Sequence, residues 1–161
     1  MTTTTTYTAR PITPRALREL RTTDDAGRRT DGFTDAEGGS PLRCCLRHSE
    51  PGERLALVSY APLRRWASET GATPGAYDEQ GPVFIHADAC AGPAGDTLPF
   101  AGSHRTLRRY SAEGRILGGR LVEEPGAFQQ ALREAFDDPA VALVHVRAVE
   151  YGCFLYEVRR G

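Results

Sequence analysis

The chain has 161 residues, of which 40% are hydrophobic and 25% charged, and this composition fits one ordinary globular domain rather than a disordered or fibrous chain. The formal net charge is −1, and the 20 basic residues are all arginines spread along the chain, so no nucleic-acid partner is expected. The absence of lysine excludes Schiff-base and lysine-nucleophile chemistry.

No segment approaches the ~18 consecutive apolar residues of a membrane span. The threonine-rich start, Met1–Thr6, does not have the pattern of a secretory signal. We therefore expect no membrane contact and a cytoplasmic location. The four cysteines are irregularly spaced, contain no C-x-x-C pair and are expected to be reduced. If Cys44 and Cys45 lie in a strand, their side chains point to opposite faces, and at most one of them faces a given pocket.

The N-terminal part, residues 1–40, is predicted to be a polar segment. Thr13 and Pro14 have the pattern of a helix N-cap followed by a first-turn proline, and Leu17 and Leu20 share one side of the short helix that would follow. The glycine-rich stretch Thr22–Ser40 is predicted to be a long loop. Residues 41–161 are then expected to form a single α+β domain.

Strand and turn patterns dominate that domain. Apolar spacing predicts one strong helix over residues 125–136. The predicted strands are Leu42–Arg47, Arg54–Tyr60, Val83–Ala87, Thr106–Tyr110, Arg115–Val122, Val141–Val149 and Cys153–Arg159. Six of them pair through tight turns into three hairpins. The pattern predicts an α+β fold with a mainly antiparallel sheet, or a small partly closed barrel, of about seven strands.

Several short motifs in fixed order resemble a known bacterial family. They are Pro41-Leu42-Arg43, Glu50-Pro51-Gly52-Glu53, Gly81-Pro82-Val83-Phe84, Asp138-Pro139, Val144-His145-Val146 and Gly152-Cys153-Phe154. Over roughly residues 41–160 the chain resembles the family called domain of unknown function 1203. The resemblance implies a small single-domain bacterial protein and carries over no activity.

The strongest candidate for acid–base chemistry is the pair His145 and Arg147. Two residues apart on a predicted strand, they project from the same face. An imidazole beside a fixed cation can move a proton while the guanidinium binds a carboxylate. The alternative is a half-exposed sheet face on which both side chains meet water.

A second group of candidates surrounds the long loop Asp88–Ser103. His86 and Cys90 flank its start and, if the chain turns after Asp88, the imidazole lowers the pKa of the thiol; Asp88 and Asp96 are possible general bases. Cys153 is another candidate nucleophile. Beyond the loop, Arg105, Arg108 and Tyr110 are candidate substrate-binding residues. Each of these residues has an ordinary structural alternative: a hydrogen-bonded histidine, a buried thiol or a solvated basic strand.

His86, Cys90, His145 and Cys153 also supply atom types that bind zinc, but no C-x-x-C or H-E-x-x-H spacing supports such a site. No metal and no cofactor are therefore expected. The leading hypothesis is a cofactor-independent enzyme that acts by histidine and arginine chemistry on a small anionic, carboxylate-bearing metabolite. The alternatives are a non-catalytic small-molecule-binding module and an accessory subunit that forms a homodimer through an exposed sheet edge.

Overall fold

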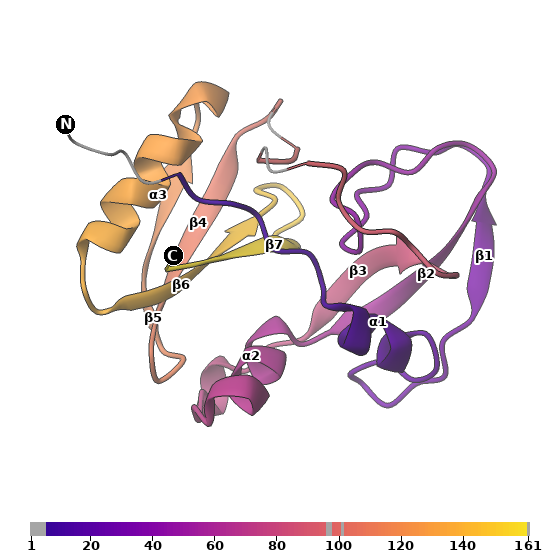
Figure 1. Ribbon diagram of the computed structural model, residues 1–161, viewed down its shortest axis with the longest axis horizontal. Helices are drawn as coiled ribbons and strands as arrows, with labels where there is room; N and C mark the ends of the chain where they lie inside the picture. Colours follow the sequence, from indigo (N-terminus) through magenta and orange to yellow (C-terminus); the bar gives the residue numbers. More distant parts are fainter. Residues whose placement is uncertain (1–5, 96–97, 101, 161) are drawn as a thin grey trace.

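The computed structural model describes residues 6–95, 98–100 and 102–160, so the candidate base Asp96 lies outside the described residues. Seven strands form two antiparallel sheets, which confirms the α+β class (Figure 1). The smaller sheet has the order β1-β2-β3, and its strands are β1 (Gly32–Asp35), β2 (Glu53–Tyr60) and β3 (Gly81–His86). The larger sheet has the order β5-β4-β6-β7, and its strands are β4 (Arg105–Ser111), β5 (Ile116–Val122), β6 (Val141–Arg147) and β7 (Phe154–Arg159).

The larger sheet follows the sequence pattern closely. The predicted hairpins β4–β5 and β6–β7 are both present, and β4 also pairs with β6. The predicted C-terminal helix is a short 3₁₀ turn, Pro125–Ala127, followed by α3 (Phe128–Asp137). Helix α3 lies against one face of this sheet (Figure 1). Its apolar stripe faces the sheet, and Phe128, Leu132 and Phe136 are buried in the contact.

The smaller sheet differs from the prediction at one strand. Residues 42–47 form a compact turn, in which the Leu46 amide donates to the Leu42 carbonyl at 2.9 Å and Leu46 has a φ of 59°. A side chain in the left-handed region is incompatible with a continuing strand. The predicted partner of β2 is therefore replaced by β1, which lies within the expected loop Thr22–Ser40.

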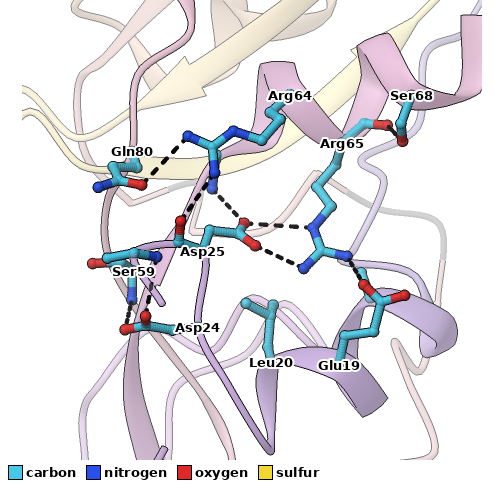
Figure 2. A network of polar contacts seen from close by, with 12 residues as sticks. Glu19, Leu20, Asp24, Asp25, Ser59, Arg64, Arg65, Ser68 and Gln80 are labelled. Carbon is cyan, nitrogen blue, oxygen red and sulfur yellow. Dashed lines mark hydrogen bonds and ion pairs between the residues drawn. The ribbon is translucent and has the colours of Figure 1, made fainter. Parts of the chain in front are cut away.

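Two further helices cover the region where the sheets meet. The predicted helix α1 (Pro14–Leu20) begins at Thr13, whose hydroxyl accepts from the Ala16 amide at 3.2 Å. The sequence analysis did not predict α2 (Pro62–Thr70), which ends at Gly71 in the left-handed conformation. Arg65 of α2 binds Asp25 at 2.7 Å and contacts Glu19 of α1, so one guanidinium ties both helices to the intervening loop (Figure 2).

The two sheets have separate hydrophobic cores, and Phe154 connects them. Phe154 of β7 packs with the buried residues of the smaller sheet, and the chain before α1 pairs with β7 through Arg10 and Glu157. Arg43, which is almost fully buried, donates to the Phe154 carbonyl at 2.8 Å. The turn at residues 42–47 is thus fixed against both sheets. No helix within the described part of the chain has the length and apolar character needed to cross a membrane.

Candidate functional site

Three cysteines and one histidine meet at the end of β3. Cys44 and Cys45 come from the turn at residues 42–47, His86 is the last residue of β3, and Cys90 follows in the next loop. Their candidate ligand atoms all lie within 4.8 Å of one another. We call these four residues the thiol–imidazole cluster.

The distances inside the cluster are short. The Sγ atoms of Cys44 and Cys45 are 3.9 Å apart, and His86 Nδ1 lies 3.4 Å from the first sulfur and 3.8 Å from the second. The His86 backbone amide also donates to Cys44 Sγ at 3.2 Å. Because residues 42–47 form a turn, the adjacent thiols point to the same side. Residues 42–47 are not the strand on which the expectation of opposite faces was based, yet Cys45 and not Cys44 lines the cavity beside the cluster.

Glu53 sets the orientation of the imidazole. Its carboxylate lies 2.7 Å from His86 Nε2 and is itself bound by both terminal nitrogens of Arg47, at 2.8 and 2.9 Å. Arg47, the Glu50 amide and His86 hold the pKa of Glu53 well below its usual range, so this carboxylate accepts the Nε2 proton. The lone pair of a neutral His86 is then on Nδ1, which faces the two sulfurs.

The cluster has a buried side and an open side. Cys44 is 1% exposed and lies at the back, whereas the other three members line a cavity of about 390 Å³ together with Arg47, Arg54 and Asp88. The Cys44 thiol donates to Cys45 Sγ and lowers the pKa of Cys45, while the pKa of Cys44 is raised. The hydrogen bond from Cys44 thus favours the thiolate form of Cys45, the thiol of this pair that lines the cavity.

The structure places His145 away from this cluster. Its ring is 1% exposed, lies between Tyr110 and Phe154 at centroid distances of 4.8 and 5.0 Å, and has Nε2 3.0 Å from Glu157. Burial lowers the pKa of His145 although the Glu157 carboxylate opposes the shift. His145 does not line the cavity of the cluster, nor a cavity of about 330 Å³ that its neighbours Phe154 and Glu157 line.

The predicted arginines are committed to protein partners. Arg108 and Arg147 both bind Glu79, at 2.8 and 2.6 Å, and Arg147 also donates to the Gly152 carbonyl at 2.9 Å. Arg105 donates to the carbonyls of His104 and Phe100 at 2.9 and 3.0 Å. In this conformation the three guanidinium groups bind carboxylate and carbonyl groups of the protein itself.

Cys153 lies in a different cavity from His86 and Cys90. Its thiol is 3.7 Å from the Tyr151 carbonyl and lines a cavity of about 180 Å³ that Arg147 also lines. The structure thus joins His86 with Cys90 in the thiol–imidazole cluster. It brings four other predicted residues together on the paired strands β4 and β6, namely Arg108, Tyr110, His145 and Arg147. These two groups do not form one site.

Sequence reasoning missed Cys44, Cys45 and Glu53 as members of one site. The signal available in the sequence was the pair of adjacent cysteines upstream of His86-Ala87-Asp88-Ala89-Cys90. The sequence does not show that these cysteines lie near His86. Their proximity follows from the turn at residues 42–47, which lies beside β3 through the Leu42–Phe84 bridge.

The fold and this cluster define an α+β protein with two antiparallel sheets and a compact set of soft metal-binding atoms at the end of β3. The chain belongs to the family described as protein of unknown function DUF1203, whose model matches residues 39–160. Comparisons with curated proteins and with solved structures gave no match.

Proposed function

We propose that this chain is a zinc-binding protein in which Cys44, Cys45, His86 and Cys90 bind one ion. The observation that carries the proposal is the convergence of three sulfurs and one imidazole nitrogen within 4.8 Å. Three cysteines and one histidine are an established ligand set for structural zinc sites.

The spacing of these atoms fits a tetrahedral ion. With Zn–S bonds of ~2.3 Å and Zn–N bonds of ~2.05 Å, tetrahedral angles separate two sulfurs by ~3.8 Å and a sulfur from a nitrogen by ~3.6 Å. The corresponding distances are 3.9 Å between Cys44 and Cys45, and 3.4 and 3.8 Å from these sulfurs to His86 Nδ1. Only small side-chain movements are needed to close the ligand shell.

The surroundings also suit a metal centre. Histidine ligands commonly donate their second ring N–H to a carboxylate, and Glu53 occupies that position on His86 at 2.7 Å. A backbone amide hydrogen bond to a thiolate, as from His86 to Cys44, stabilises the charge that a metal-bound sulfur carries. The 390 Å³ cavity gives an ion a path from solvent.

A bound ion would connect segments that are far apart in the sequence. It would fasten the turn at residues 42–47 to β3 and to the start of the long loop. Because the unfolded chain has no preformed site, metal binding would raise the free energy of unfolding.

The experiment measures the metal content and the cobalt spectrum of the purified full chain. We expect about one zinc per chain, and after exchange with Co²⁺ the d–d absorption of a tetrahedral thiolate site. C90S and H86Q should lose most of this absorption, whereas C153S should retain it because that thiol lies outside the cluster. H86C replaces the imidazole with another ligand, a thiolate, and should bind cobalt with a stronger sulfur charge-transfer band. Cobalt binding by H86C would show that H86Q loses the metal because a ligand is missing and not because the chain misfolds. Equal metal content in C90S and C153S, or no metal in the wild-type chain, would refute the proposal.

A second candidate is a thiol-dependent enzyme, favoured by the order of groups from Cys45 through His86 to Glu53. A nucleophile, a base 3.8 Å away and a carboxylate that orients the base form the arrangement of a cysteine-based catalytic triad. A metal-free wild-type chain in which iodoacetamide labels Cys45 first, and H86Q slows that labelling, would favour this candidate. The acid–base reaction of His145 with Arg147 on a small anionic metabolite stays a prediction.

A further inference from the structure

Another cavity is lined by residues of α1, α2 and β7, remote in sequence from the thiol–imidazole cluster. Its volume is about 330 Å³, within the range of small-molecule sites. We call it the seam cavity. We propose that the seam cavity binds a small organic anion that carries an aromatic or other flat apolar group.

The apolar part of the cavity is aromatic. Tyr60, Trp66 and Phe154 line it, and the rings of Tyr60 and Phe154 are 5.6 Å apart with an interplanar angle of 56°. Ile12 and Pro62 extend this wall. Buried rings that still border an open cavity offer a flat ligand a large contact area.

The carboxylates that line the cavity are already neutralised by arginine. Glu157 binds Arg159 at 2.7 Å, and Glu69 binds the same guanidinium at 2.9 Å. Glu19 contacts Arg65, which Asp25 also holds (Figure 2). A cationic ligand would have to displace these pairs, so the cavity does not favour a cation.

The polar groups left for a ligand are donors. Arg10 lines the cavity, and its guanidinium has no hydrogen-bond partner within residues 6–95, 98–100 and 102–160. The Tyr60 hydroxyl likewise has none among the residues described, and burial together with the Glu157 charge raises the pKa of Tyr60, so the phenol keeps its proton. The other lining arginines, Arg15, Arg65 and Arg159, are paired with carboxylates, whereas Arg10 has no ion pair among the described residues. A carboxylate can accept from both groups, and arginine binds it through its planar fork.

Glu157 connects this cavity to the buried His145. One carboxylate oxygen faces His145 Nε2 at 3.0 Å and the other faces Arg159 at 2.7 Å. Both oxygens are therefore held in place, and the wall beside Tyr60 is fixed before a ligand arrives. Such preorganisation reduces the ordering cost of binding.

The chain contains one tryptophan, Trp66, so its fluorescence reports directly on the seam cavity. The probe is phenylacetate, titrated into the full-length protein at constant ionic strength, with phenylacetamide as the uncharged analogue. We expect a saturable change of Trp66 emission with phenylacetate in the micromolar to millimolar range and a response at least several-fold weaker with phenylacetamide.

Two conservative variants test the named donors. R10Q and Y60F should each weaken phenylacetate binding several-fold. R18Q removes a guanidinium from α1 that does not line the cavity and should bind as the wild-type chain does. An unchanged thermal unfolding midpoint would show that the Y60F effect is not loss of fold.

Three results would overturn the inference. They are the absence of a saturable response to phenylacetate, equal affinity for phenylacetamide, and a loss in R18Q as large as that in R10Q. None of these variants alters the thiol–imidazole cluster, so a failure here does not refute the zinc proposal.

Discussion

Variants of Glu53 test how the hydrogen bond to His86 contributes to the proposed metal site. In E53Q the side chain keeps its size and can still accept from His86, but it loses the charge that fixes the imidazole. In E53A the hydrogen bond at 2.7 Å is lost as well. Removing such a partner weakens metal affinity ~10–100-fold, or about 1.4–2.7 kcal/mol. We expect E53Q near the lower end of this range and E53A near the upper end.

The effect on folding should be small by comparison. The ion pair of Glu53 with Arg47 is partly exposed, with side-chain exposures of 24% and 46%, and pairs of this kind contribute about 0–1 kcal/mol. Metal affinity should therefore fall much more than the stability of the metal-free chain. A variant that loses both equally would point to a structural role for Glu53.

The assay is a competition titration of zinc between the protein and a chromophoric chelator. E50Q is the matched control, because Glu50 is an exposed neighbouring acid whose side chain makes no hydrogen bond to the cluster. Zinc dissociation constants for E53Q and E53A that stay within a factor of about two of the E50Q value would refute the reasoning about the imidazole.

Three further predictions concern stability. The folded state lowers the pKa of His145 and of Glu157, so the unfolded chain binds more protons and the free energy of unfolding falls as the pH decreases below ~6.5. Between neutral pH and pH about 5, urea unfolding should show a smaller fall of this free energy in H145Q than in the wild type. Equal falls in the two proteins would contradict this prediction. L55A removes a fully buried side chain of β2 and should cost ~2–5 kcal/mol in chemical unfolding, whereas L57A, at a site 52% exposed on the same strand, should cost well below that; equal losses would mean that the core is misassigned. G38A should cost at least ~1 kcal/mol in the same assay, because Gly38 has a φ of 74° and an added Cβ would lie 2.9 Å from the Pro51 backbone nitrogen; a neutral result would exclude this conformation.

Local sequence signals were sufficient to predict the helices and hairpins that are determined by their own residues. Helix α3 repeats apolar residues on one face, and the β4–β5 and β6–β7 hairpins have short turns containing glycine, so pattern and fold agree there. The start of α1 follows from Thr13 and Pro14 for the same reason. The missed helix α2 had comparable signals, namely Pro62 in its first turn and Gly71 at its end.

The sites could not be predicted in the same way, because they depend on contacts between distant segments. Cys44 and Cys45 lie about forty residues before His86, and they converge with it only because Leu46 takes a positive φ and Leu42 pairs with Phe84. Conversely, Arg147 was predicted to bind substrate, but in the fold Glu79, which is distant in the sequence, binds its guanidinium.

The two proposed sites depend on the same structural element. Turn residue Arg43, next to Cys44 and Cys45, reaches across to the Phe154 carbonyl, and Phe154 is part of the aromatic wall of the seam cavity. Arg43 is buried, its hydrogen-bond partners are the carbonyls of Phe154 and Pro41 rather than a carboxylate of the described residues, and burial lowers its pKa to about 10. Because a buried cation is costly unless it is hydrogen-bonded, the Phe154 carbonyl helps to hold the turn in place. A metal that pins the turn at Cys44 and Cys45 would fix one end of this contact, and the packing of β7 fixes the other.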